Sequence, residues 1–365
     1  MIEPLPPHDH AGRRARARAL VADSPTVALL VTSPVNVRWL TGFTGSNGSL
    51  LLTADEALLV TDARYEQRVR SHHPDVELLI TSEPVADVIT WVADAGLSSL
   101  GLEGTHVSWT EANRWQAVGE QVSVSVSAND GLIERLREVK DDAEIARIRR
   151  ACQITTDVLA TVIDDLRPGL TEREVRERLE SGFIEAGAEA PAFDSIVAAG
   201  PNGAVPHHES GDRPIEAGRL VTIDCGARVD GYHADCTRTV AVGEPTEEWR
   251  EIHAVVVRAQ AAGRAAAVPG ASGKHVDAAA PDVIESEGLG DRFVHGTGHG
   301  VGLEIHEDPA VGQRATSTLA ARMTVTVEPG VYIPGNGGVR IEDTVLVTDG
   351  GHEVLTDIPH ELRVL

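Results

Sequence analysis

Residues 221–240 read VTIDCGARVDGYHADCTRTV, and this stretch decides the fold of the second half of the chain. Apolar and polar residues alternate in Val221–Asp224 and again in Ala234–Val240, and a glycine-bearing connection separates the two runs. The pattern predicts a β-hairpin with a long turn. Side chains two positions apart share a strand face, so Asp224 and Asp235 lie on neighbouring strands and can point the same way.

A second stretch repeats this plan. Residues 325–347 read VTVEPGVYIPGNGGVRIEDTVLV, which is a strand, an acid, a glycine-rich turn, a strand and an acid. The acids here are Glu328 and Glu342, and a threonine lies two positions from each. Such a repeat predicts two related half-domains that face each other. Four carboxylates would then converge, which is unfavourable unless cations neutralise them, so we expect a metal site.

A histidine-rich stretch supplies a nitrogen ligand. Residues 293–308 read FVHGTGHGVGLEIHED, and their glycines exclude a helix. In an extended strand His295 and His299 share a face, whereas His306 has the opposite parity and needs a bend to reach the same place. No GK[ST] follows, which argues against a phosphate-binding loop.

One histidine with four carboxylates is a plausible ligand set for two divalent ions that share bridging carboxylates. Because oxygen ligands dominate and no thiolate takes part, we expect manganese, with cobalt, iron or zinc as the alternatives. Paired metals would activate a bridging water and polarise a carbonyl, which is the chemistry of hydrolysis.

The bulk composition excludes several classes of protein. The chain has 365 residues and a net charge of −24, so we expect no nucleic-acid partner and no association with anionic membranes. Three cysteines without a framework argue against a secreted disulfide protein. The N-terminus has no apolar signal region, and no run is long enough to span a membrane, so we expect a cytoplasmic protein. Only Lys140 and Lys274 are lysines, and every other basic residue is arginine.

The order of elements predicts two domains. Strands alternate with helices up to residue 126, which is typical of an α/β domain over residues 1–130. Residues 36–43 read as a mixed segment ending in a turn, and residues 131–140 as a linker. Residues 141–365 run helix, helix, strand, hairpin twice, which predicts an α+β domain with a pseudo-twofold internal repeat. Thr171 and Glu174 form a capping box at the start of one of these helices.

Taken together, D-x-G, D-x-T-R-T eleven positions on from the first aspartate, HGTGHGVGLEIHE, V-E-P-G and R-I-E-D resemble the M24 metallopeptidases of the pita-bread fold. More narrowly, they resemble the branch of Xaa-Pro aminopeptidases and Xaa-Pro dipeptidases (prolidases). The segments NVRWLTGFTGSNGSLLL and VTDARY resemble the creatinase-like N-terminal domain of that branch. The resemblance covers essentially the whole chain.

The resemblance implies roles for the metal ligands. Asp224 would bind one metal in bidentate fashion, Asp235 and Glu342 would bridge both metals, and His299 and Glu328 would complete the second. Glu328 would also be the general base for the bridging water, a role that needs proton exchange near neutral pH.

The resemblance also implies substrate contacts. His207 and His306 match two histidines that contact substrate and stabilise the tetrahedral intermediate, and His295 matches a residue near the proline pocket. Arg340 lies two positions before Glu342 on one strand face, where it can pair with a ligand carboxylate, and we count it among the residues around the substrate.

The expected activity is an exopeptidase that hydrolyses the N-terminal Xaa-Pro bond of proline-containing peptides. An Xaa-Pro dipeptidase is the alternative, and it would need an arginine for the free carboxylate of its substrate. Prolidase-like relatives often carry that arginine directly after the proline of the HEDP-type segment, whereas Ala310 follows Pro309 here, with Arg314 further on. This departure favours the aminopeptidase, although Arg64 or another base could substitute.

Three further readings are weaker. The N-terminal domain argues against a methionine aminopeptidase, and the intact ligand set argues against a creatinase. A non-catalytic peptide-binding protein on the same fold has little support. The resemblance implies a homodimer, formed in many relatives through the N-terminal domain.

Overall fold

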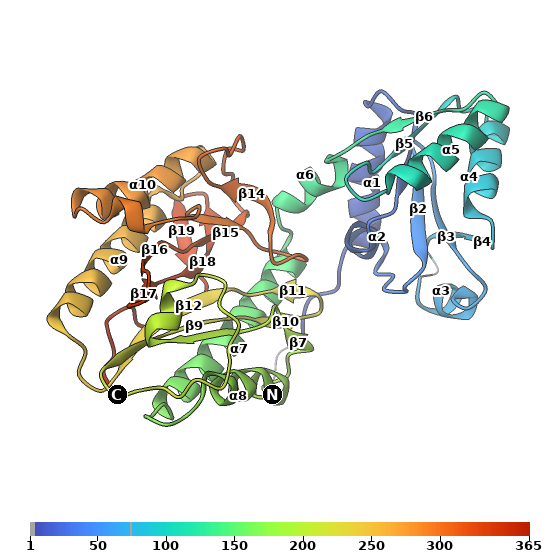
Figure 1. Ribbon diagram of the computed structural model, residues 1–365. Helices are drawn as coiled ribbons and strands as arrows, with labels where there is room; N and C mark the ends of the chain where they lie inside the picture. The colour runs from blue at the N-terminus through green and yellow to red at the C-terminus, as the bar shows by residue number, and fades with distance from the viewer. Residues whose placement is uncertain (1–3, 74) are drawn as a thin grey trace. The chain divides into compact units, whose positions relative to one another are not determined.

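The computed structural model describes residues 4–73 and 75–365 (Figure 1). The chain divides into two compact units, Pro7–Arg137 and Glu138–Leu365, and Pro6 belongs to the second. Residues 131–140, interpreted from sequence as a linker, contain helix α6 (Leu132–Glu138), and the division between the units falls at its end.

The first unit is built on a six-stranded sheet with the order β4-β3-β2-β1-β5-β6. Strand β2 runs antiparallel to both of its neighbours, and the other neighbouring pairs are parallel. The strands are β1 (Ala28–Val31), β2 (Gly48–Thr53), β3 (Ala57–Thr61), β4 (Glu77–Ile80), β5 (Ser99–Leu102) and β6 (Ser125–Ala128). The helices before α6 are α1 (His10–Ala22), α2 (Pro34–Thr41), α3 (Glu66–His72), α4 (Pro84–Asp94) and α5 (Trp109–Gln121). The α/β prediction for this part of the chain is confirmed.

Helix α2 replaces the mixed segment that we expected at residues 36–43. Pro34 occupies the first turn, where its missing N–H costs nothing, and Gly42 ends the helix in the left-handed region with φ 76°. Eight residues are too few to hold a helix alone, so tertiary packing supplies the stability. The buried Trp39 and Leu40 provide that packing, and their burial could not be known from the local sequence.

The second unit repeats one order of elements, as predicted. The first half comprises α7 (Asp142–Asp164), α8 (Glu172–Glu185), β7 (Ala190–Pro191), β8 (Ile196–Ala199), the short helix η1 (Gly200–Ala204), β9 (Arg219–Cys225), β10 (Ala227–Val229), β11 (Tyr232–His233) and β12 (Cys236–Val242). The second half comprises α9 (Glu247–Ala266), α10 (Gly273–Ser286), η2 (Gly290–Arg292), β13 (Gly298–Gly300), β14 (Glu307–Val311), β15 (Thr324–Val327), β16 (Gly330–Ile333), β17 (Gly337–Arg340), β18 (Asp343–Thr348) and β19 (Gly351–Val354). The predicted capping box of Thr171 and Glu174 is present at α8.

Both halves build their hairpin in the same way. Strands β9 and β12 pair antiparallel with Asp224 opposite Thr237, and β15 and β18 pair antiparallel with Thr326 opposite Thr344. Each outer pair encloses a smaller antiparallel pair, β10–β11 in the first half and β16–β17 in the second. The long turns that we expected are therefore small hairpins of their own, and the repeat extends to this detail.

The helices of the second unit cover these strands in pairs (Figure 1). Helices α7 and α8 contact strands of the first half, and α9 and α10 contact strands of the second. One buried apolar cluster joins α9 and α10 to β16 and β17, and includes Trp249, Val256 and Val331. Strands with helices grouped outside them confirm the α+β prediction.

The histidine-rich strand is much shorter than expected. Only Gly298–Gly300 is extended and paired, as β13, and residues 301–306 form a tight turn. Gly302 packs against the carboxylate of Glu307, where a Cβ atom would lie 2.2 Å from Oε1, so this glycine serves the turn and not a strand face. The turn supplies the bend that the parity of His306 requires. None of the described helices is long and apolar enough to cross a membrane.

Candidate metal centre

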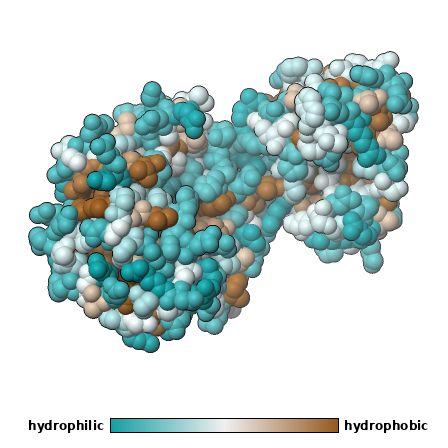
Figure 2. All heavy atoms as spheres, in the orientation of Figure 1, coloured by the Kyte–Doolittle hydropathy of each residue, from teal (hydrophilic) through white to brown (hydrophobic). Residues whose placement is uncertain are grey.

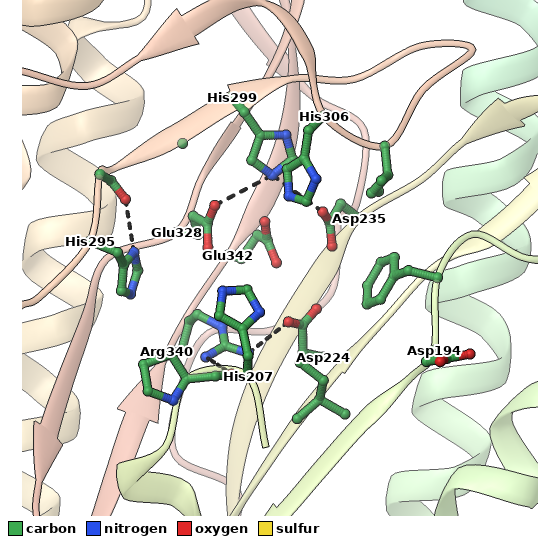
Figure 3. Close-up of a pocket in the computed structure, with 16 residues that line it drawn as sticks. Asp194, His207, Asp224, Asp235, His295, His299, His306, Glu328, Arg340 and Glu342 are labelled. Carbon is green, nitrogen blue, oxygen red and sulfur yellow. Dashed lines mark hydrogen bonds and ion pairs between the residues drawn. The ribbon is translucent and has the colours of Figure 1, made fainter. Parts of the chain in front are cut away.

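A cavity of about 420 Å³ opens between the two hairpins of the second unit (Figure 3). All nine residues that we selected from sequence line it: His207, Asp224, Asp235, His295, His299, His306, Glu328, Arg340 and Glu342. The remaining lining residues include Phe193, Asp194, Ile196, Pro206 and Ile305. Segments that lie far apart in the sequence therefore meet here.

Three of these residues could hold one ion together. Asp235, His299 and Glu342 each offer a ligand atom, and these atoms all lie within 4.8 Å of one another. His299 Nε2 lies 3.6 Å from Asp235 Oδ2 and 3.4 Å from Glu328 Oε1. Asp224 reaches into the same cavity from the end of β9, as Figure 3 shows.

The tautomer of His299 suits a metal ligand. Its Nδ1 lies 3.1 Å from the carbonyl oxygen of Gly300, and a carbonyl can only accept, so Nδ1 carries the hydrogen. Burial, aided by the neighbouring His306, lowers the pKa of His299 to about 4. The imidazole is therefore neutral near pH 7 and presents the Nε2 lone pair to the carboxylates.

The carboxylates are held where ionisation is unfavourable without a cation. Burial raises the pKa of Asp235 and of Glu342 well above the usual range, and the neighbouring carboxylates raise both further. Burial also raises the pKa of Glu328 to about 8, against the opposing effect of Arg340. A divalent cation would remove this penalty because it attracts the ionised form of each group.

Two buried oxygens have no hydrogen-bond partner. Among the described residues, Asp224 Oδ1 and Glu342 Oε1 are the carboxylate oxygens in this condition. Buried polar atoms are almost always paired, so these two require an explanation. The three cysteines are buried, and none lines the cavity. Orphaned hard oxygens and one imidazole nitrogen fit hard divalent cations.

Threonine hydroxyls form hydrogen bonds with the residues that could bind the metal. Thr237 Oγ1 donates to Glu342 Oε2 at 2.7 Å, which leaves Oε1 as the free oxygen of that carboxylate. Thr326 Oγ1 accepts from the backbone N–H of His299 at 3.1 Å, and Thr344 Oγ1 donates to the backbone oxygen of Asp235 at 2.8 Å. The sequence places these threonines two positions from Asp235, Glu328 and Glu342, and the structure gives all three contacts with the site.

A hydrogen-bonded chain crosses one side of the cavity. Arg340 Nη2 donates to Asp224 Oδ2 at 2.6 Å, and Nη1 donates to the Tyr332 hydroxyl at 3.0 Å. The Tyr332 hydroxyl in turn donates to His295 Nε2 at 2.8 Å, because His295 Nδ1 already donates to Gly296. Sequence reasoning missed Tyr332, whose only signal was an aromatic residue in the glycine-rich turn of the second repeat.

The two remaining histidines come from turns. The ring of His306 lies edge-on to that of His299, with centroids 4.3 Å apart. His207 follows η1 in a segment that Glu172 ties down. The Glu172 side chain is fully buried and accepts hydrogen bonds from four donors of residues 199–211, including His208 Nε2 at 2.8 Å. We assigned neither Glu172 nor His208 a role from sequence, because the first acid of a helix is usually solvated.

Comparisons with known proteins identify the family of the chain. The model described as Metallopeptidase family M24 matches residues 146–349, and that described as Creatinase/Prolidase N-terminal domain matches residues 13–139. The chain is 38% identical over 337 residues to an Xaa-Pro dipeptidase of Pyrococcus furiosus, covering 92% of this chain and 94% of that protein. A solved Xaa-Pro dipeptidase from Bacillus anthracis is similar at TM-score 0.93 and 36% identity, over 98% of this chain and 100% of that one. An X-Pro aminopeptidase from Thermotoga maritima is similar at TM-score 0.88 and 33% identity, over 96% and 99%.

Proposed function

The chain belongs to metallopeptidase family M24, and on this premise we propose that it is an Xaa-Pro dipeptidase. The predicted family, with its creatinase-like first domain and pita-bread second domain, is confirmed. From sequence alone we favoured the aminopeptidase, but the relatives named above support the dipeptidase better. A dipeptidase of this kind would hydrolyse the single peptide bond of an Xaa-Pro substrate.

We propose that Asp224, Asp235, His299, Glu328 and Glu342 hold two divalent ions, with manganese the expected metal. When bound, such ions would supply an activated water and polarise the scissile carbonyl. The two orphaned carboxylate oxygens and the free Nε2 of His299 support this assignment.

The other residues around the cavity would act on substrate directly. Glu328 is the proposed general base, since its carboxylate faces the cavity beside His299. His207 and His306 both line the cavity and could donate an N–H to the oxyanion that develops on the carbonyl oxygen. Burial lowers the pKa of His306, which favours the neutral ring and leaves one N–H to donate. His295 and Arg340, joined through Tyr332, would line the proline pocket.

The proposal of a dipeptide substrate rests on a difference in charge between the metal cavity and a hollow that adjoins it. A second hollow, of about 680 Å³, shares His295, Gly296 and Gly298 with the metal cavity. Its other lining residues are Phe293, Val294, Ala310, Val311, Gly312, Gln313, Arg314 and Ala315. Arg314 is the one residue with a permanent charge in this lining, because burial lowers the pKa of His295 to about 4.

Arg314 also has no ion pair among the residues that the structure describes, although the chain carries a net charge of −24. A short zwitterionic peptide would therefore place its ammonium group towards the acids of the metal cavity. Its free carboxylate would lie towards Arg314, where an arginine can accept it in bidentate fashion.

An Xaa-Pro aminopeptidase is the second candidate. The replacement of the expected arginine by Ala310 and the likeness to the Thermotoga maritima X-Pro aminopeptidase favour it. Because Arg314 is exposed, a longer peptide could also pass it.

The test compares an Xaa-Pro dipeptide, its C-terminal amide and an Xaa-Pro-Yaa tripeptide as substrates with manganese. We expect the dipeptide to be cleaved best, and Arg314→Gln to raise its KM at least about tenfold, or roughly 1.4 kcal/mol, with no such effect on the amide. Arg292→Gln is the matched control, since Arg292 is exposed and lines neither hollow. Efficient cleavage of the tripeptide alone would establish the aminopeptidase instead.

Failure to bind metals or to cleave any of the three substrates would favour the non-catalytic peptide-binding alternative. The homodimer and the cytoplasmic location stay predictions. Gel filtration with light scattering would test the first.

A further inference from the structure

One of the two lysines of this arginine-rich chain is buried. Thirty of the 32 basic residues are arginine, and the two exceptions are Lys140 and Lys274. Lys274 is exposed, but the Lys140 side chain is only 1% accessible. Lysine carries a compact point charge on a flexible stem, whereas arginine carries a broad planar fork of donors. A narrow buried space distinguishes the two, so the exception at Lys140 points to a specific contact.

That contact is a buried ion pair with a residue next to His306. Lys140 Nζ lies 2.9 Å from Glu307 Oε1, and the Glu307 side chain is only 6% accessible. The ammonium group also donates to the backbone oxygen of Glu138 at 3.3 Å. Arg322 fixes the backbone of Lys140 on both sides, since Lys140 N donates to the Arg322 oxygen at 3.0 Å and Arg322 Nε donates to the Lys140 oxygen at 2.7 Å.

The partner carboxylate organises the turn that carries His306. Glu307 Oε2 accepts from the backbone N–H of Glu304 at 3.2 Å, and Oε1 lies against Gly302 at a place that leaves no room for a side chain. The backbone N–H of His233 donates to the Gly302 oxygen at 2.9 Å from the other side of the turn. Residues 302–307 thus wrap around one carboxylate.

We propose that Lys140 is a positioning residue for His306, acting through Glu307 and the turn of residues 302–307. The ammonium group holds the Glu307 carboxylate in place, and the turn built on that carboxylate directs His306 into the metal cavity. Figure 3 shows His306 in that cavity beside His299. The first residues of the second unit thereby set the geometry of a histidine that lies more than 160 positions away in the sequence. The catalytic part of this inference rests on the role proposed above for His306.

The test is a double-mutant cycle. Lys140→Met alone removes the buried counter-ion of the Glu307 carboxylate and can unfold the protein, so the variant to compare is the neutral double Lys140→Met/Glu307→Gln. We expect kcat for the Xaa-Pro dipeptide to fall at least about tenfold, with metal content and the far-ultraviolet spectrum unchanged. In a His306→Ala background the same double change should alter kcat less than about twofold. The reason is that Lys140 and Glu307 affect catalysis through His306, which is already absent in that background.

Arg149→Met is the matched control, because Arg149 forms an ion pair with Glu353 on the surface of the same unit. Its kcat should stay within about twofold of the unmodified protein. An equal loss in both backgrounds of the cycle, or full activity of the neutral double variant, would overturn the proposal.

A readout without activity separates this inference from the proposed function. In protein labelled with 15N-histidine, the His306 resonance can be assigned by its disappearance in His306→Ala. We expect it to shift or broaden in the neutral double variant and to stay unchanged in Arg149→Met. An unchanged resonance would refute the positioning role even if the protein cleaved no Xaa-Pro peptide.

Discussion

Replacement of the buried Glu172 by glutamine should damage catalysis more than a surface change of the same kind. Glu172 Oε1 accepts from the Ala199 N–H and from Asn202 Nδ2, both at 2.8 Å. Oε2 accepts from His208 Nε2 at 2.8 Å and from the Gly211 N–H at 3.2 Å. Glutamine keeps one acceptor oxygen and places an amide NH2 against the other two donors.

The magnitude follows from these contacts. Both of these donors lose a hydrogen bond to a charged oxygen and face an amide NH2 instead, at a cost on the order of 1–3 kcal/mol each before relaxation. Because residues 199–211 reach the surface, water can restore part of this, and we expect a net cost of about 2–3 kcal/mol. If this whole free-energy cost favours a conformation in which the segment that carries His207 is displaced, kcat/KM drops roughly 30- to 150-fold.

The assay measures kcat/KM for the dipeptide together with thermal unfolding. Glu174→Gln is the control, since Glu174 is an exposed capping-box residue two positions away on the same helix, and its loss should cost at most about 1 kcal/mol. We expect it to leave kcat/KM unchanged. A Glu172→Gln protein with normal stability and normal kcat/KM would refute the reasoning, and lowered stability with normal kcat/KM would show that Glu172 does not act through His207.

Three further predictions concern the metals and pH. Asp235→Asn should lose metal by elemental analysis and lower kcat by more than about a thousandfold, since it replaces one of the proposed metal ligands. In metal-free protein the pKa of Glu328 is raised to about 8, so the folded state holds a proton that the unfolded chain releases. Stability should therefore fall as pH rises from about 4.5 to 8. Thermal unfolding should show this fall in protein treated with chelator and should not show it in protein loaded with metal. Burial lowers the pKa of His253 to about 4, so stability should fall by up to roughly 1.4 kcal/mol per pH unit as pH drops from 6.5 to 4, and His253→Gln should flatten that slope.

The parts of the fold that could be predicted were those with a periodic signal. The alternation around Asp224 and around Glu328 predicted two hairpins, and their repetition predicted that four acids meet. Helix α2 was missed because its stability comes from burying Trp39, which is a property of the folded unit and not of the local sequence. Glycines were misleading at residues 293–306, where Gly302 makes room for a carboxylate rather than lining a strand.

The residues that support the site were harder to find than those inside it. Glu172 and Tyr332 have ordinary local sequences, and only their burial and partners single them out. Lys140 is conspicuous in the sequence as one of only two lysines, but the rarity of a residue type does not indicate its role until its contacts are known. On the face that Figure 2 shows, most side chains are hydrophilic and the hydrophobic ones are scattered among them.

The matching construction of the two hairpins also bears on how such a protein could have arisen. Each half of the second unit contributes two carboxylates, one from either side of its enclosed strand pair. A half-length ancestor could have assembled the full set of four only by associating with a copy of itself. Duplication and fusion would then have allowed the copies to diverge. The position of His299, which only one of the two halves provides, is an example of such divergence. His299 lies on β13 of the later half, whereas β8, at the same place in the earlier half, reads IVAA.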